Sequence, residues 1–294
     1  INAGSMKELV LIRDNPANKI NFYHLAVFLV SLPFYRFYSH LALLSFGIHT
    51  LIHFNKLALK PIFTRRTLLL QSIFFVTAIS TIYATSKASA FNEWGLDVTI
   101  LLIPVLFCIN PLDLKTYYPQ LLTIFSLGCA ATIVYLYVNA IITIRFYDMP
   151  LSMVFSPAFT NHNFSQPIDI HATFFSLQIA VALVFTISAL IKARRLTNRI
   201  FYSLIGLILL AGIVQLSSKS VFAALFLTIN IALPLFLFQG VRRVRFIAIA
   251  TSSTIIIAGL LFSSRTFRDR YITELKEDFS SLKTNQRVEP RILR

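Results

Sequence analysis

Two short polar segments interrupt a chain that is otherwise almost entirely apolar, and they carry the side chains best suited to chemistry. The first is residues 161–171 and the second is residues 215–220. Charged and polar groups are costly beside lipid, so clusters of them at the ends of apolar helices are candidates for a functional site.

The first segment contains two histidines and one aspartate. His162 lies nine residues before His171, and Asp169 lies two residues before it. If the backbone is extended at this point, Asp169 and His171 could bind a polar substrate together, and His162 is a further candidate for that role. The spacing matches no firm zinc site, which disfavours a metal. The alternative is a set of solvated loop residues at the membrane surface.

The second segment separates two apolar runs with almost no loop between them. A lysine so close to two helix ends, Lys219, must face water or a polar cavity. The backbone N–H groups at the start of the next helix, near Ser220, add the positive end of the helix dipole. This arrangement predicts a small phosphate site, with Ser218 beside it as a substrate-binding residue. The alternative is a lysine that reaches the interface and only caps a turn.

A third cluster, rich in arginine, follows the last apolar run in residues 263–294. Its first half places an aromatic residue or leucine at every fourth position, which is typical of an amphipathic helix lying on the membrane surface. Arginine can donate two parallel hydrogen bonds to phosphate. We therefore predict that tail arginines, among them Arg265, Arg287 and Arg291, bind phosphate, with contact to anionic headgroups as the alternative.

Long apolar elements are needed to position these segments. Of the 294 residues, 56% are hydrophobic and 13% are charged, whereas a soluble domain carries about 25% charged residues. This composition predicts an all-α polytopic membrane protein. The net charge of +15 does not indicate nucleic-acid binding, because the basic residues lie in short loops between apolar runs, where they set topology.

Nine apolar runs are long enough to cross a bilayer that thins locally. With the N-terminus in the cytoplasm, the inner loops hold 15 Lys and Arg, and the outer loops before the tail hold four. That bias predicts this orientation and places both polar segments and the tail on the outer side. The predicted spans are residues 20–34, 37–54, 67–83, 95–109, 118–144, 171–191, 200–216, 221–238 and 246–262.

The domain organisation follows from this pattern. Residues 1–5, which precede Met6, are expected to be remnants of cloning. Residues 6–262 are expected to form one transmembrane helical domain. Residues 263–294 are expected to begin a large outer loop that continues in the native protein.

Three motifs resemble those of the O-antigen ligase and O-antigen polymerase family. Residues 169–176, Asp-Ile-His-Ala-Thr-Phe-Phe-Ser, are similar to the family's I-H-P-T-Y-x-S entry to a span. Residues 216–220 are similar to its T-x-S-R-x-A turn, with Lys219 in place of the arginine. Residues 286–294 are similar to its R-x-x-x-R-x-x-x-W approach in the large periplasmic loop. The order and spacing of the three match over about residues 20–294.

The resemblance implies a GT-C-like glycosyltransferase of the bacterial inner membrane with a periplasmic site. Such an enzyme would move a glycan from undecaprenyl diphosphate to an acceptor sugar on lipid A-core or a growing polysaccharide. Lys219 and Arg287 or Arg291 would hold the diphosphate without a metal or cofactor, and the family's histidine base would lie beyond Arg294. The expected partners are this donor, the acceptor and membrane lipids. A transporter or flippase of an anionic lipid-linked substrate and a non-catalytic membrane scaffold are the alternatives.

Overall fold

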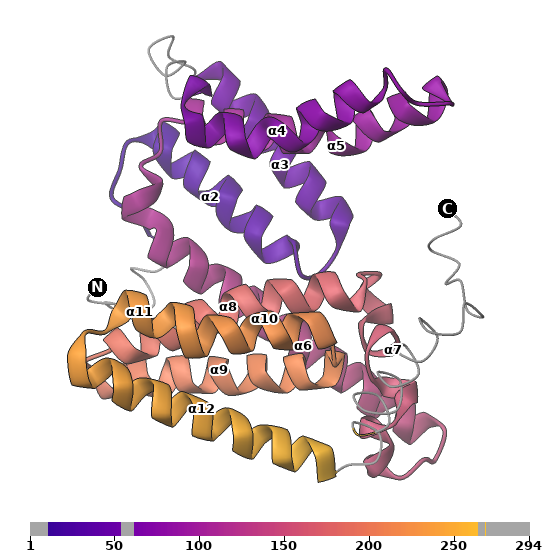
Figure 1. The fold of residues 1–294 in the computed structure, drawn as a ribbon, viewed down its shortest axis with the longest axis vertical. Coiled ribbons are helices and arrows are strands. Elements are labelled where there is room, and N and C mark those ends of the chain that lie inside the picture. Colours follow the sequence, from indigo (N-terminus) through magenta and orange to yellow (C-terminus); the bar gives the residue numbers. More distant parts are fainter. Residues whose placement is uncertain (1–10, 54–61, 264–267, 269–294) are drawn as a thin grey trace. The chain divides into compact units, whose positions relative to one another are not determined.

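The protein is described from a computed structural model, which covers residues 11–53, 62–263 and 268 (Figure 1). Every regular element in these residues is a helix, and the same residues contain no β-strand. The all-α class predicted from the composition is therefore confirmed.

A helix occupies the position of each of the nine predicted spans. Five of these helices are long and apolar enough to cross a membrane: α5, α6, α8, α9 and the run from α10 to α11. They indicate a multi-pass membrane protein, and the crossing of the other four helices stays a prediction. The helices are α2 (Pro16–Ser31), α3 (Arg36–Ile52), α4 (Arg65–Ser80), α5 (Lys87–Ile109), α6 (Leu114–Phe146), α8 (Ala172–Lys192), α9 (Leu196–Leu216), α10 (Lys219–Leu227), η5 (Thr228–Ala232), α11 (Leu233–Leu237) and α12 (Gly240–Ser263).

The helix α5 begins at Lys87 and not at Gly95, where the apolar run predicted its start. The hydroxyl of Ser86 caps its first turn by accepting a backbone N–H at 3.3 Å. The Lys87 ammonium donates to the carbonyl oxygens of Thr81 and Ile82, at 2.6 and 3.0 Å, which follow the end of α4. The prediction was wrong here because capping and these bonds stabilise polar first turns that a search for apolar residues does not detect.

The described chain divides into two compact units, with a boundary between Leu121 and Leu122 inside α6. The N-terminal unit holds α2 to α5 and the first residues of α6. The C-terminal unit holds the rest of α6, the helices up to α12 and the short segment Pro33–Tyr35.

In the N-terminal unit, polar side chains join the helices of each hairpin. Between α2 and α3, His24 Nε2 lies 3.0 Å from Ser45 Oγ, and His49 Nδ1 lies 2.8 Å from Asn21 Oδ1. Between α4 and α5, a threonine hydroxyl donates to Asp97 at 2.9 Å. Hydrogen bonds of this kind fix helix register where the surrounding side chains are apolar.

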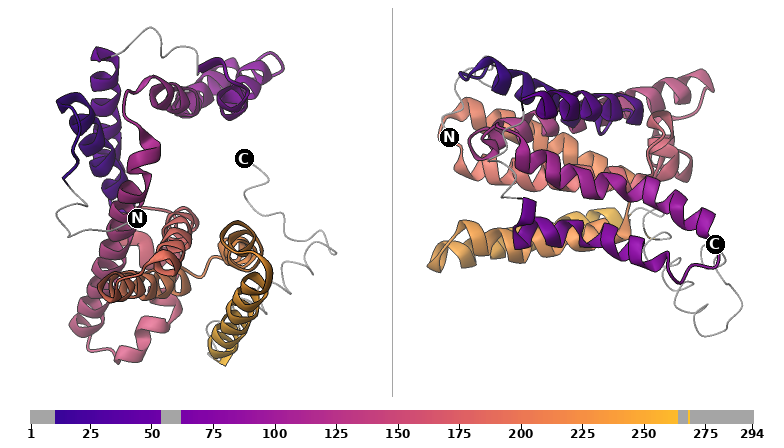
Figure 2. Two further views of the ribbon diagram at one scale, coloured as in Figure 1. Left: turned by 90° about the vertical axis from the view of Figure 1, so that its left-hand side faces the viewer. Right: turned by 90° about the horizontal axis from the view of Figure 1, so that it is seen from above.

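In the C-terminal unit, α8 and α9 form an antiparallel hairpin that packs along its whole length (Figure 1). The continuous helical run from α10 to α11 packs against α8, and α12 lies beside this run (Figure 2). A π-helical turn, η5, interrupts the run, and its buried Asn230 accepts a hydrogen bond from Thr251 of α12 at 2.9 Å. This bond ties α12 to the rest of the unit.

The contact between α6 and α9 depends on a glycine. A Cβ atom added at Gly212 would lie 2.5 Å from Cδ1 and 2.7 Å from Cγ1 of Ile133, which is fully buried on α6. At Gly206, on the same helix, an added Cβ would meet only Thr186 Cγ2 at 3.7 Å, an ordinary contact. The packing of the Ile133 side chain against α9 therefore requires glycine at position 212, whereas nothing comparable requires it at position 206.

We expect Gly212→Ala to lower the thermal stability of the purified protein, because overpacking a closed core costs about 1–3 kcal/mol. Gly206→Ala is the matched control, and it should leave stability unchanged or raise it slightly because alanine favours the helix. Adding Ile133→Val, which removes the nearest carbon, should restore part of the loss. Equal melting temperatures for the two glycine variants would contradict this packing.

A carboxylate links the start of α2 to α6. Asp14 accepts the backbone N–H of Asn15 at 2.7 Å, the side-chain amide of Asn18 at 3.0 Å and the hydroxyl of Tyr117 at 3.0 Å. The bond from the Asn15 backbone, followed by the others, holds the pKa of Asp14 below its ordinary value.

A carboxylate with a depressed pKa stabilises the fold above its unfolded-state pKa, and that contribution is lost as the pH falls through the folded-state value. We therefore expect the melting temperature of the wild type to fall as the pH drops below about 4. Asp14→Asn should start lower at neutral pH and show a smaller acid-dependent fall. An identical pH dependence for both proteins would show that the link contributes nothing.

Candidate functional site

One glutamine joins the two polar segments. Gln215, at the end of α9, is 0% exposed, and its backbone carbonyl accepts the N–H of Asn161 at 3.0 Å. Its side-chain amide donates to the carbonyl oxygens of Val154 and Phe159, at 2.7 and 2.6 Å. The two segments, far apart in the sequence, therefore lie together at one end of the α8–α9 hairpin.

Two aromatic residues close the other side of this junction. The hydroxyl of Tyr137, on α6, donates to the carbonyl of Ala211 at 3.1 Å and lies 3.5 Å from the side-chain oxygen of Gln215. Its ring meets that of Phe164 edge-on, with the centroids 5.0 Å apart, and Phe164 is buried. Helices α6, α7 (His162–Ser165) and α9 are thus held around one buried amide.

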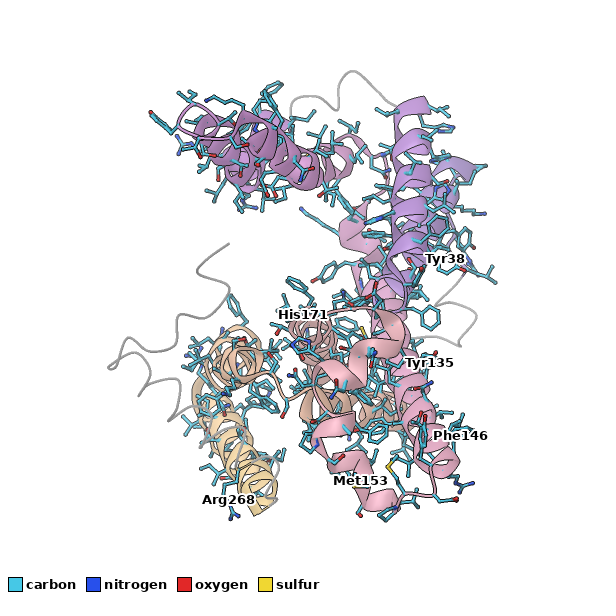
Figure 3. All side chains as sticks on the ribbon, turned by 90° about the vertical axis from the view of Figure 1, so that its right-hand side faces the viewer. Tyr38, Tyr135, Phe146, Met153, His171 and Arg268 are labelled. Atoms are coloured by element: carbon cyan, nitrogen blue, oxygen red, sulfur yellow. The ribbon has the colours of Figure 1, made fainter. Side chains whose placement is uncertain are left out.

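The segment between α6 and α8 is a chain of short helical turns, where the sequence suggested a loop. It contains η2 (Leu151–Phe155), η3 (Pro157–Phe159), α7 and η4 (Gln166–Ile168). Figure 3 marks Phe146 at the end of α6, Met153 in η2 and His171 at the start of α8. The amide of Gln215 binds the first two of these turns, so it sets the path that brings His162 to His171.

The two histidines of the first segment face each other. The ring centroids of His162 and His171 are 4.1 Å apart, with the planes at 72°, and both residues are exposed. The backbone N–H of Ala172 points at His162 Nδ1 at 3.5 Å, and that of Thr173 points at His171 Nδ1 at 3.3 Å. A ring nitrogen that accepts an N–H carries no proton, so each neutral ring has its proton on Nε2. The pair therefore caps the start of α8 through its Nδ1 atoms.

Asp169 does not pair with His171 in the way that an extended backbone would allow. Its φ and ψ of 51° and 35° are left-handed, so the chain turns at this residue. Asp169 remains exposed beside the histidines, but His162 is the close neighbour of His171. The condition of an extended backbone is therefore not met at this residue, and the binding of a substrate by Asp169 and His171 together stays a prediction.

Backbone strain is concentrated in and beside the two polar segments. Among the described residues, the non-glycine residues with positive φ are Asp148, Asn161, Asp169 and Ser217. Asn161, with φ 56° and ψ −126°, occupies a region that normally requires glycine. Such residues persist only where surrounding bonds hold them, and for Asn161 the bond to the Gln215 carbonyl does so.

The second segment places Lys219 at the start of α10. Ser217 ends α9 in the left-handed conformation, with φ 53°, and Ser218 is the N-cap position of α10. Both serines are buried, whereas Lys219, the first residue of α10, is partly exposed. The start of α8 and the end of α9 lie together on one side of their hairpin. His171, just before α8, and Lys219, just after α9, therefore lie on that side as well. Helix α10, which begins at Lys219, packs against α8.

The tail arginines cannot be placed beside this site. Arg265, Arg287 and Arg291 lie outside the described residues, as does the predicted amphipathic helix apart from its first residue and Arg268. Arg268 is exposed and follows α12 (Figure 3). Their role in binding a diphosphate stays a prediction.

The site offers hydrogen-bond donors and one cation. Within the described ranges, no group of three or more His, Cys, Asp or Glu side chains is arranged to hold a metal ion. The polar groups of the site are two imidazoles, the Ser218 hydroxyl, the Lys219 ammonium and the Asp169 carboxylate. Groups of these types bind sugar hydroxyls and phosphate oxygens.

Comparison with known proteins gives no relative for this chain. No family model matches it, and neither a curated protein nor a solved structure does. The O-antigen ligase-like motifs therefore remain a resemblance of short segments.

Sequence reasoning missed the residues that hold the site together. Gln215 was noted only as the first residue of the second segment, and Tyr137 was not singled out at all. One signal was present for Gln215, since an uncharged amide at the end of an apolar helix has to find buried partners. Nothing local in the sequence marks Tyr137 as its neighbour.

We expect Gln215→Glu to release the turns between α6 and α8, because glutamate keeps the shape of glutamine but cannot donate to the two carbonyl oxygens. Leaving buried acceptors unpaired costs about 1–3 kcal/mol each, so amide hydrogen exchange in residues 150–165 should accelerate at least tenfold. The matched control is Gln71→Glu, which alters a buried glutamine of α4 that donates to Leu101. Exchange in residues 150–165 that stays as slow as in the wild type would contradict the anchoring role.

Proposed function

We propose that the protein is an O-antigen ligase-like glycosyltransferase with a GT-C-like fold. It would move a glycan from undecaprenyl diphosphate to an acceptor sugar of lipid A-core or a growing polysaccharide. The proposal places it in the bacterial inner membrane, with a cytoplasmic N-terminus and a periplasmic site. Its main support is that the two polar segments, residues 161–171 and 215–220, are joined by the bond from Asn161 to Gln215 at one end of α8 and α9, and that each overlaps a stretch that resembles a motif of the family.

The donor's diphosphate is assigned to the second segment. The ammonium of Lys219 and the backbone N–H groups at the start of α10 both favour an anion. As the glycosidic bond to the diphosphate breaks, negative charge grows on the leaving phosphate oxygen, and a fixed cation stabilises it. Arg287, Arg291 and Arg265 complete this binding in the proposal.

The transferred sugar is assigned to the first segment and to Ser218. The imidazoles of His162 and His171 are assigned to bind sugar hydroxyls, and the carboxylate of Asp169 can accept hydrogen bonds from such hydroxyls. The acceptor hydroxyl attacks the anomeric carbon, the carbon–oxygen bond to the diphosphate breaks, and undecaprenyl diphosphate leaves. A general base removes the proton of the acceptor hydroxyl, and the resemblance places that base beyond Arg294.

A transporter or flippase for an anionic lipid-linked substrate is the second candidate, and one observation favours it. Because α5 begins at Lys87, Asp97 lies ten residues from its start and twelve from its end at Ile109. A carboxylate well inside a candidate membrane helix is a common feature of transport sites. It is bonded to the hydroxyl of Thr77 at 2.9 Å, which also fits a structural role. This candidate assigns the essential residue to Asp97 and not to Lys219.

The two candidates differ in which variants abolish glycan transfer in cells that lack the native gene. We expect Lys219→Ala to lower transfer about a hundredfold, as is typical when a group that stabilises developing charge is removed. Lys219→Arg should retain most activity because the cation remains, and Arg291→Ala should also lose activity. Lys115→Ala, an exposed lysine of the N-terminal unit, is the control, with protein abundance in membranes measured for each variant.

Activity near that of the wild type in both Lys219→Ala and Arg291→Ala would exclude the proposed diphosphate site. The variant Asp97→Asn separates the candidates. It should retain transfer if the protein is a ligase. Loss of lipid-linked substrate export in Asp97→Asn, with Lys219→Ala unaffected, would support the transporter.

A further inference from the structure

Seven cations gather at the opposite end of the C-terminal unit from the polar segments. Four of them are the Lys and Arg of residues 192–199, where α8 turns into α9, and three are the arginines of residues 242–245, in the first turns of α12. We refer to these seven residues as the basic belt. The helical stretch from α10 to α11 starts where α9 ends and packs along α8. It therefore finishes on the side of the unit where α8 ends, and α12 begins on that side too (Figure 2).

Among the described residues of the C-terminal unit, no acidic side chain lies at the end that carries these charges. Between Asp169 and Asp269 the sequence contains no Asp or Glu. Among the described residues of the C-terminal unit, the acids are Asp148 and Asp169, and both lie at the end with the polar segments. Within the part of this unit that the structure describes, the positive charge of the basic belt is therefore not balanced.

Two arginines of the belt are held in the same way at the two turns. Arg199 donates from Nε to the carbonyl oxygen of Ala193 at 3.0 Å, and Arg243 donates from Nε to that of Phe238 at 3.0 Å. In each case an arginine in the first turns of a helix folds back onto the turn before it. A guanidinium fixed through Nε keeps its two terminal amino groups as the edge that suits two oxygens of a phosphate.

The surroundings of these cations are apolar. Leu196 beside the first turn and Val241 and Val244 beside the second are exposed. At the ends of these candidate membrane helices, fixed cations alternate with exposed apolar side chains. A phospholipid is complementary to such a surface, because its phosphate can bind the cations while its acyl chains cover the apolar side chains. A soluble acidic partner would use the charges but would leave the apolar side chains uncovered.

We propose that the basic belt is a binding site for a phospholipid with an anionic phosphodiester headgroup. The phosphodiester oxygens accept hydrogen bonds from arginines of the belt, among which Arg199 and Arg243 are already anchored, and the acyl chains lie along the exposed apolar side chains. Lys and Arg in a loop are enough to set the orientation of the membrane helices, and their side chains need no particular geometry for that role. The matching anchored arginines are the additional feature that topology does not explain, and they reduce the side-chain ordering needed on binding.

The test is a binding titration of the purified full chain in neutral detergent with phosphatidylglycerol, detected by native mass spectrometry. The double variant Arg199→Gln/Arg243→Gln should bind at least tenfold more weakly than the wild type. Since these arginines also close the two turns, a second variant, Arg194→Gln/Arg195→Gln, removes two exposed charges that make no such bond. This second variant should also bind phosphatidylglycerol more weakly than the wild type does.

The matched control is Arg65→Gln/Arg66→Gln, two consecutive exposed arginines at the start of α4, which should bind within twofold of the wild type. An equal loss in this control, or no loss in either belt variant, would overturn the proposal. Phosphatidylcholine bound as tightly as phosphatidylglycerol would also overturn it. So would displacement of the lipid by millimolar inorganic phosphate, because the site would then be one for free phosphate.

Discussion

The arrangement of the candidate site depends on one buried amide. A glutamine at the end of an apolar helix cannot remain unpaired, because burying an unsatisfied amide costs about 1–3 kcal/mol. The carbonyl oxygens of Val154 and Phe159, in short 3₁₀ turns, need donors for the same reason. Gln215 satisfies both of them, and the bond from Asn161 to its backbone adds a third link. The positions of α7 and of the two histidines follow from this junction.

The places of the helices could be predicted from the sequence, because apolar runs of sufficient length have few other stable structures in a membrane. The start of α5 could not, since its first turns are polar and depend on capping by Ser86 and on the bonds of Lys87 to the end of α4. Loop charges led to the prediction that the two polar segments lie on one side. The bond that joins them and the pairing of His162 with His171 depend on contacts between distant residues, which no local pattern specifies.

The same two helices, α8 and α9, position chemically different groups at their two ends. One end carries two imidazoles that cap a helix, two buried serines and Lys219. The other end carries fixed arginines, with no acidic neighbour among the described residues of the unit. In the proposed function the first end would bind the diphosphate-linked glycan on the periplasmic side, and the second would contact anionic lipid on the cytoplasmic side. The α8–α9 hairpin would then keep the two proposed sites apart by the thickness of the membrane.

Whether the two polar segments form one substrate site is tested most directly by photo-crosslinking. An undecaprenyl diphosphate analogue with a photoreactive group beside the diphosphate would be bound to the purified protein, irradiated and mapped by peptide mass spectrometry. We expect label in peptides from both residues 161–171 and residues 215–220, each reduced by excess unlabelled lipid diphosphate. Label confined to one of these segments, or found only in α2 to α5, would contradict a shared site.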